Sequence, residues 1–389
     1  MNQHCRHLPE SRSGTEKLLN EYITYLMEHS DWAHPAWNLE LMRSRESNKW
    51  NYIDGCMING ILQLYEITGD SRYLDFADRF VSGFVGEDGS VRTYDRTEYS
   101  LDNINPAMNL FRLYDCTGRP YYRKATEEFR RQLYEMPRTG AGNFWHKKIY
   151  PDQVWLDGIY MALPFYLEYA RRNQEEAAIA DCFRQLENVE QCMRDPLTGL
   201  YYHGYDESRR MYWADPVTGC SPNFWLRAIG WFILGLTDIL DILRSMDRPQ
   251  QSARLGNMLQ MLASALLPWQ DETGLYYQLP ALPAFPGNYL ETSGTALIAA
   301  AMLKAVRLGF LPETFAESAE KAFYGICDHR LTRNADGTPC LSGICLVGGL
   351  GGRAKRDGSA AYYLGEPVVK NDAKGVGPFL LAYTEMRRI

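Results

Sequence analysis

The sequence predicts an all-α fold in which six helical hairpins close into a ring, with short β-hairpin loops at its mouth. Three observations lead to this prediction. Apolar residues recur at helical spacing along most of the 389 residues, and a glycine or a charged turn ends each apolar stripe. One hairpin is also repeated, because LYEITGDSRYL and LYDCTGRPYYR begin at Leu64 and Leu113, 49 residues apart.

Twelve helices are expected along the chain. The first lies near residues 15–29 and the last near 371–387. Between them, helix pairs are expected within 51–85, 102–133, 154–193, 222–267 and 289–327. Gly69 supplies a left-handed stop, Asp70 can cap the helix that follows it, and Pro312 suits a first helical position. The two TGLYY stretches are expected to form short hairpins.

Six helix pairs could form either an open superhelical stack or a closed α/α toroid. The number of pairs favours closure, and so does the distribution of charge. The second helix of each pair has a charged face, such as RKATEEFRRQ, whereas the first helices are poorer in charge, as inner helices should be. No low-complexity linker divides the chain, so we expect one domain over residues 1–389.

Composition excludes several classes of protein. The net charge is −7 with no basic stripe, which argues against a nucleic-acid partner. The nine cysteines form no CxxC pair and no zinc spacing, which is typical of reduced thiols. The polar start of the chain has no signal-peptide core, and the most apolar window contains Arg227 and Asp238. These features predict a cytoplasmic protein without a membrane segment.

Polar and aromatic residues gather at the starts of the alternate, inner helices, which would converge on one mouth of a toroid. Asp, Asn and Ser at helix starts are usually caps, and capping is the simpler role for Asp102 taken alone. Asp157 differs because Asp152 is better placed to cap the same helix. The residues concerned are Trp50, Tyr52, Asp54, Asp102, Asn103, Asn105, Trp155, Asp157, Trp225, Arg227, Trp231, Glu291, Thr292, Ser293, Asn371, Asp372 and Lys374.

Asp102 and Asp157 are the candidate acid pair. They lie 55 residues apart on successive inner helices. Repulsion between two neighbouring carboxylates, helped by burial, raises one pKa and lets that acid act as a proton donor. The loops add His203 in YYHGYDES, and His146 and Lys147 in WHKKIYPDQ. The segment GGLGGRAKRDGS lacks the phosphate-loop pattern and is expected to return over the mouth.

At these residues the chain resembles glycoside hydrolase family 105, the unsaturated rhamnogalacturonyl hydrolases. The resemblance runs from about Trp50 to the C-terminus, through LDNINPAMNLFRLYDCTG, DQVWLDGIYMALPF, HGYDES, WADPVTGCSPNFWLRAIGW, YLETSGTA and EPVVKNDAKGVGPF. It implies an (α/α)6 barrel and a substrate with a terminal 4,5-unsaturated uronic acid. The double bond of that sugar is hydrated, and the resulting hemiketal opens.

The resemblance also implies roles for individual residues. Asp157 would be the general acid and base, and Asp102 would tune its pKa or position water. Trp155, Trp225 and Trp231 would stack on the sugar, Arg227, His203 and Lys147 would hold its hydroxyls or carboxylate, and Tyr52 would line the pocket. No metal or organic cofactor is implied.

Two departures from the family pattern leave the leaving sugar open. Related chains often have Trp at Tyr205 and Gly at Leu226, and Leu226 would narrow the space beside Trp225. Three alternatives stay open: a family 88-like unsaturated glucuronyl hydrolase, a sugar epimerase and a non-catalytic helical-repeat binding module. An epimerase would normally rely on a histidine pair at the mouth, and only His203 is well placed.

Overall fold

The computed structural model describes residues 7–44 and 46–388, so Cys5 and the polar start of the chain up to Arg6 lie outside the described residues. Each of the twelve expected helices is present in the described part. Two further helices of six residues each, α2 (Leu39–Ser44) and α13 (Ala360–Gly365), were not expected because they are too short to show periodicity.

Six helices form an inner ring. Each packs against the next, α14 packs on α3, and the 3-10 turn η4 (Asn105–Ala107) completes the contact between α5 and α7. The ring is therefore closed, which confirms the (α/α)6 barrel over an open superhelix. The inner helices are α3 (Tyr52–Thr68), α5 (Met108–Thr117), α7 (Leu156–Asn173), α9 (Leu226–Leu243), α11 (Thr292–Arg307) and α14 (Ala373–Met386).

Six helices lie outside this ring and bury one face each. In α10 the buried residues recur every three or four positions, whereas α11 is buried continuously from Thr292 to Val306. This contrast confirms the inner and outer assignment made from charge. The outer helices are α1 (Ser13–Glu28), α4 (Ser71–Ser82), α6 (Pro120–Glu135), α8 (Glu176–Met193), α10 (Pro249–Leu266) and α12 (Thr314–His329).

The two copies of the repeated hairpin end their first helix in the same way. Gly69 and Gly118 both have φ of 69°, in the left-handed region where glycine has no Cβ penalty. Asp70 accepts a hydrogen bond from the amide of Arg72 and caps α4, as predicted. Helix α12 begins at Thr314, so Pro312 lies two residues before the position expected for it.

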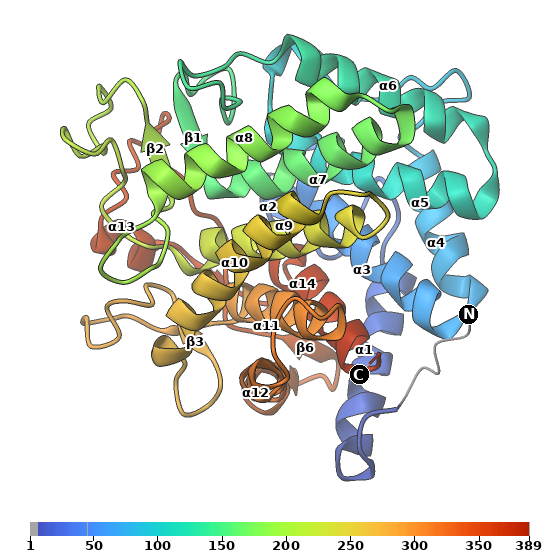
Figure 1. Cartoon of the computed structure of the whole chain (residues 1–389). Helices are drawn as coiled ribbons and strands as arrows, with labels where there is room; N and C mark the ends of the chain where they lie inside the picture. Colours follow the sequence, from blue (N-terminus) through green and yellow to red (C-terminus); the bar gives the residue numbers. More distant parts are fainter. Residues whose placement is uncertain (1–6, 45, 389) are drawn as a thin grey trace.

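Short antiparallel strand pairs sit beside the starts of the inner helices. Strand β1 (Gln153–Trp155) pairs with β2 (Gly204–Asp206) directly before α7, and the two lie near α13 (Figure 1). Both TGLYY stretches close isolated antiparallel bridges, Arg194 with Tyr201 and Gln270 with Tyr276, so they form the expected hairpins. The other pairs are β3 (Tyr276–Tyr277) with β4 (Leu290–Glu291), β5 (Leu331–Arg333) with β6 (Pro339–Leu341), and β7 (Ile344–Cys345) with β8 (Val368–Val369).

Two expected helix starts are different in the structure. Asp102 lies in the 3-10 turn η3 (Leu101–Asn103), and α5 begins only at Met108. Pro106 explains the delay, because it lacks an amide donor and disfavours helical geometry at the residue before it. Asp102 therefore caps no helix, and its side chain is available for other contacts.

The expectation that Asp152 caps α7 is also wrong. Asp152 has φ of 59° and turns the chain into β1, so three strand residues separate it from the helix. The N-cap of α7 is Trp155, in extended geometry and without a side-chain cap. The strand places Asp157 at the second position of the helix.

Other sequence expectations concern membranes and cysteines. The described residues contain no helix that is both long and apolar enough to cross a membrane. The eight cysteines in this part of the chain are free thiols.

Candidate active site

Two consecutive inner helices present their polar residues in the same way. Trp155 and Trp225 are the N-caps of α7 and α9, each in extended geometry, and a buried leucine follows each of them. Asp157 and Arg227 then occupy the second position of their helices. An acid and a cation thus lie at equivalent places on the rim of one mouth.

Asp157 lies against a buried imidazole. Its Oδ2 is 3.1 Å from Nε2 of His203, whose side chain is fully buried. The two atoms are close enough for a hydrogen bond but not aligned for one, so both are buried polar atoms without a hydrogen bond among the described residues. The main chain fixes this pair, because Trp155 lies opposite Gly204 in the β1–β2 ladder and Leu156 donates its amide to the carbonyl of His203 at 3.0 Å.

The other ring nitrogen of His203 contacts a residue that the sequence did not suggest. Nδ1 lies 2.6 Å from the hydroxyl of Tyr363, which is buried in α13. Burial raises the pKa of Tyr363 well above its ordinary value. The ring of Tyr363 stacks on Trp225 at 5.8 Å and 19°. A chain of contacts therefore runs from Tyr363 through His203 to Asp157.

The segment before α13 passes close to the same residues, as expected for the glycine-rich stretch. A Cβ on Gly348 would lie 2.4 Å from the ring of Trp225, and one on Gly349 would lie 3.5 Å from Trp155. Leu350 packs against Gly204 in β2. Only a residue without a side chain fits at position 348, so the glycines allow the segment to approach the tryptophans.

Asp102 is committed to a salt bridge. Its Oδ2 lies 2.5 Å from Nζ of Lys147, and its Oδ1 lies 3.7 Å from Nε2 of His146. Burial raises the pKa of Asp102, but the charge of Lys147, with a smaller effect of His146, outweighs burial and leaves that pKa below its ordinary value. Burial lowers the pKa of Lys147, and Asp102 more than restores it. Asp102 is therefore not the member of the pair whose pKa the expected repulsion would raise.

His146 links the two acids. Burial lowers the pKa of its imidazole to about 4, against an opposing effect of Asp102 and a smaller one of Asp157. Its ring stacks on Trp155 at 4.3 Å and 17°. Gly158 permits this position, since a Cβ there would lie 2.8 Å from Nδ1 of His146. Both acids also act on the pKa of Lys147, so the structure places the predicted pair close enough to influence the same lysine.

Arg227 is a buried cation without a carboxylate partner. Its guanidinium lies 4.7 Å from the ring centroid of Trp225, and Nη1 donates to Ser293 at 3.3 Å and to the carbonyl of Cys345. Within the described residues no carboxylate oxygen lies within 4 Å of it, although it is only 1% exposed. Burial alone would lower the pKa of Arg227. The opposing effects of Cys345, Glu291 and further groups together outweigh burial, so the pKa lies above its ordinary value and the guanidinium stays charged.

The remaining predicted residues lie at different depths. Tyr52 begins α3, and the charges of Glu40, Asp102 and Arg227 all act on its hydroxyl, whose pKa is raised mainly by burial. Trp231 lies one turn further along α9 than Arg227 and stacks on Tyr160 in the barrel interior at 4.8 Å. Trp155 is 5% exposed.

A second charged cluster borders Tyr52. Nζ of Lys374 is buried and lies 2.7 Å from Glu40 and 3.1 Å from Asp372. Asp372 is the N-cap of α14, as the sequence suggested. Glu40 belongs to the unexpected helix α2, and no periodicity or motif in that stretch could have placed it at the mouth.

The two departures from the family pattern do not face the acids. Leu226 is buried against Gly294 of α11, so its side chain lies between two inner helices and the expected narrowing beside Trp225 is not supported. Tyr205 lies opposite Val154 in the β1–β2 ladder, one residue after Gly204, which faces Trp155. Alternation along a strand turns Tyr205 to the opposite side from Gly204.

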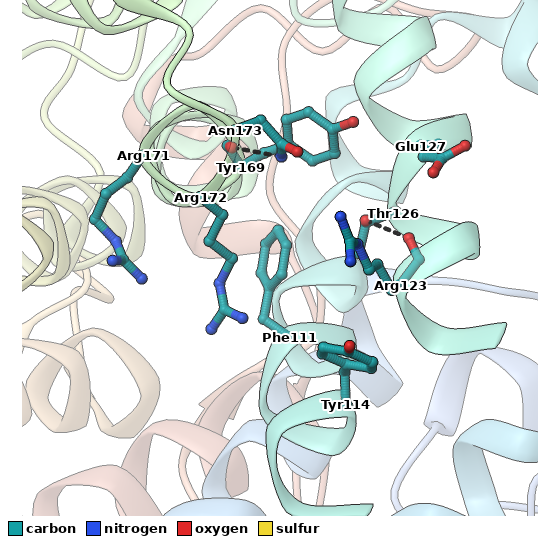
Figure 2. Close-up of a pocket in the computed structure, with 9 residues that line it drawn as sticks. All are labelled: Phe111, Tyr114, Arg123, Thr126, Glu127, Tyr169, Arg171, Arg172 and Asn173. Carbon is teal, nitrogen blue, oxygen red and sulfur yellow. Dashed lines mark hydrogen bonds between the residues drawn. The ribbon is translucent and has the colours of Figure 1, made fainter. Parts of the chain in front are cut away.

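An open pocket of about 510 Å³ lies away from the mouth, where α5 and α7 end (Figure 2). None of the predicted site residues lines it. Two of its three arginines, Arg171 and Arg172, bind Glu168 at 2.7 and 2.6 Å. Its lining residues are Phe111, Tyr114, Arg123, Thr126, Glu127, Tyr169, Arg171, Arg172 and Asn173.

The closed ring of helix pairs agrees with the comparisons to known proteins. A sequence model described as Glycosyl Hydrolase Family 88 matches residues 26–389, and the chain therefore belongs to the glycoside hydrolases of the related families 88 and 105. A solved family 105 glycoside hydrolase from C. acetobutylicum ATCC 824 is 39% identical, with a TM-score of 0.88 over 96% of this chain and 99% of that one.

Two further proteins are similar to this chain. The unsaturated rhamnogalacturonyl hydrolase YesR of Bacillus subtilis is 28% identical over 265 residues, which is 67% of this chain and 72% of that protein. The solved unsaturated glucuronyl hydrolase from Bacillus sp. GL1 is 15% identical, with a TM-score of 0.66 over 95% of this chain and 94% of that one. At that identity the second likeness concerns the fold.

Proposed function

We propose that the protein hydrolyses oligosaccharides that carry a 4,5-unsaturated uronic acid at the non-reducing end, with the unsaturated disaccharide of rhamnogalacturonan as its substrate. The observation that carries the proposal is that the two acids have different contacts. Asp102 is paired with Lys147, whereas the buried imidazole of His203 is the one ion-pair neighbour of Asp157 among the described residues. One acid is held as a carboxylate and the other is available for proton transfer.

Hydration of a vinyl ether needs one such group. Asp157 gives its proton to C4 of the sugar, and positive charge develops at C5 and the ring oxygen. Water then adds at C5 and returns a proton to Asp157, which completes the acid–base cycle. The product is a hemiketal at C5. Its ring opens by cleavage of the C5–O5 bond, which leaves a ketone at C5 and a hemiacetal at C1, and collapse of that hemiacetal to an aldehyde releases the leaving sugar with its hydroxyl.

The usual glycosidase alternative is less well supported. Attack at the anomeric carbon needs a second carboxylate that acts as nucleophile or base. Asp102 is the only other acid that we assign to this pocket, and its lowered pKa and its contact with Lys147 make it a weak base. Its proposed role is to hold Lys147 and, with it, the water that adds at C5.

Arg227 is the proposed partner of the substrate carboxylate. It is a buried cation over the face of Trp225, and none of the described carboxylates lies within 4 Å of it. A buried guanidinium normally pairs with an anion, and the uronate supplies one with matching bidentate geometry. The resemblance to YesR supports rhamnogalacturonan as the source of that uronate.

Asp157→Asn tests the proposal. Wild-type enzyme should remove the ultraviolet absorbance of the conjugated double bond, and the variant should lose that activity by a factor of about 10² or more. Asp152→Asn is the matched control, since it makes the same change five residues earlier, outside the pocket. Wild-type rates in Asp157→Asn would refute its role, and reaction in heavy water should place deuterium at C4.

The choice of leaving sugar has one specific alternative, the family 88-like reaction on glycosaminoglycan or ulvan products. It uses the same proton transfer, so Asp157→Asn does not separate the two. Comparison of kcat/KM on unsaturated disaccharides from pectin, ulvan and glycosaminoglycan lyases does. A preference for either of the last two would overturn rhamnogalacturonan as the substrate.

A further inference from the structure

We propose that Tyr363 is a positioning residue that fixes the tautomer of His203 and thereby selects which oxygen of Asp157 exchanges the catalytic proton. The role of Asp157 rests on the proposed function. The hydrogen-bond arrangement does not, because it follows from the contacts of the phenol and the imidazole alone.

The phenol proton of Tyr363 has one described acceptor. Its oxygen lies 2.6 Å from Nδ1 of His203, and the structure gives that hydroxyl no other hydrogen bond. Burial raises the pKa of Tyr363 well above its ordinary value, so the phenol keeps its proton. A hydroxyl that donates to Nδ1 requires a lone pair there, and a neutral imidazole then carries its proton on Nε2.

This tautomer places an N–H beside Asp157. Nε2 lies 3.1 Å from Oδ2 of the carboxylate without being aligned for a hydrogen bond, so a small rotation of the ring or the carboxyl group brings the proton of Nε2 to that oxygen. Oδ1 then becomes the oxygen that gives its proton to the substrate. In the other tautomer a lone pair of Nε2 would face Oδ2, and the proton of Asp157 would be held between those two atoms, away from the sugar.

The remaining ionisable neighbours keep one charge state around neutral pH. Burial keeps His146 neutral by lowering its pKa to about 4, and Asp102 and Lys147 neutralise each other. Burial raises the pKa values of Tyr362 and Cys345, and hydrogen bonds to Ser359 lower that of Asp357. A change in protonation caused by altering Tyr363 is therefore confined to His203 and Asp157.

The variant Tyr363→Phe keeps the ring that stacks on Trp225 and removes only the hydroxyl. In ¹⁵N-histidine spectra, assigned with His203→Gln, wild-type His203 should show an acceptor-type Nδ1 and a protonated Nε2. Tyr363→Phe should show a mixture of tautomers. We expect its kcat to fall roughly ten- to a hundredfold with KM unchanged, which is less than loss of the acid itself.

Tyr362→Phe is the matched control. It removes a tyrosine hydroxyl from the same helix, but that hydroxyl accepts from the amide of Gly349 at 3.0 Å and does not contact His203. The control should keep the wild-type ¹⁵N pattern and kcat. Equal melting temperatures of the variants and the wild type exclude a folding defect.

Two results would overturn the proposal. One is a wild-type spectrum that shows the proton on Nδ1 of His203. This measurement uses only the wild-type protein, so it does not depend on whether a variant folds. The other is a Tyr363→Phe protein with the wild-type spectrum and kcat. A wild-type enzyme that cleaves no unsaturated disaccharide contradicts the proposed function instead, and the ¹⁵N spectra still decide the tautomer.

Discussion

Nζ of Lys147 lies 2.5 Å from Oδ2 of Asp102, and each group shifts the pKa of the other toward its charged form. The partners come from separate segments, the loop before β1 and the 3-10 turn η3. Because the pair is largely buried, removal of either charge leaves the other charge unpaired at a site where water solvates it poorly. This dependence makes the pair a measurable part of both stability and catalysis.

Lys147→Met should therefore destabilise the protein by about 2 kcal/mol at pH 7, below the range for a fully buried pair because Lys147 is 27% exposed. The reason is the unpaired carboxylate of Asp102, whose pKa should then rise. Urea unfolding measures the loss. The double variant Lys147→Met/Asp102→Asn should recover most of it.

Lys148→Met is the control for this cycle. Its side chain is exposed, and its Nζ contacts the carbonyl of Thr97 at 3.4 Å and lies 5.7 Å from the ring centroid of Tyr99, so the change should alter the free energy of unfolding little. If Lys147→Met and Lys148→Met lost the same free energy of unfolding, the Asp102 pair would not be the source of the loss. A double variant that is no more stable than Lys147→Met would lead to the same conclusion.

Arg227→Met should lower kcat/KM roughly ten- to a hundredfold, which corresponds to loss of a charge-assisted hydrogen bond to the uronate. Arg227→Lys should fall between this variant and the wild type, because it restores charge without the planar fork. The methyl ester of the substrate provides the chemical control. Wild-type enzyme should discriminate against the ester, and Arg227→Met should not; discrimination that persists in the variant would place the carboxylate elsewhere.

His146 should make stability fall as the medium becomes acidic. Its folded pKa is lowered to about 4, so below the unfolded value of about 6.5 the unfolded chain binds a proton that the native protein does not. Between pH 8 and pH 5 this group should cost about 2 kcal/mol. Chemical unfolding of wild type and His146→Asn at both values checks it. Parallel pH profiles for the two proteins would contradict the buried neutral imidazole.

Gly348→Ala should displace Trp225, because the added Cβ would lie 2.4 Å from its ring. We expect a loss of kcat/KM of about tenfold or more, since misplacement of substrate-positioning groups by about 1 Å can cost 10²-fold. Gly365→Ala is the matched control at the end of α13, where a Cβ would meet nothing within 4 Å. Similar activity in both variants would argue against close packing of this segment on Trp225.

Much of the fold was predictable because its signals are local. Stripes of apolar residues gave the twelve long helices, and Gly69 and Gly118 marked equivalent helix ends. The site was partly predictable for a geometric reason. Asp157 and Arg227 stand at equivalent positions of inner helices, and a closed ring brings such positions to one mouth.

The missed residues depend on contacts between distant segments. Tyr363 and Glu40 reach the mouth on six-residue helices that are too short for a periodic pattern. Asp152 was misassigned for a similar reason, because β1 exists only through its pairing with β2, some 50 residues further along the chain. Propensity within one stretch cannot reveal a partner strand.

That pairing has a consequence for how this active site could be altered. Asp157 and His203 are joined through main-chain hydrogen bonds between β1 and β2, so their spacing does not depend on the bulk of neighbouring side chains. Substitutions outside this ladder can therefore be screened for activity on a new disaccharide while the proton-transfer pair is kept unchanged.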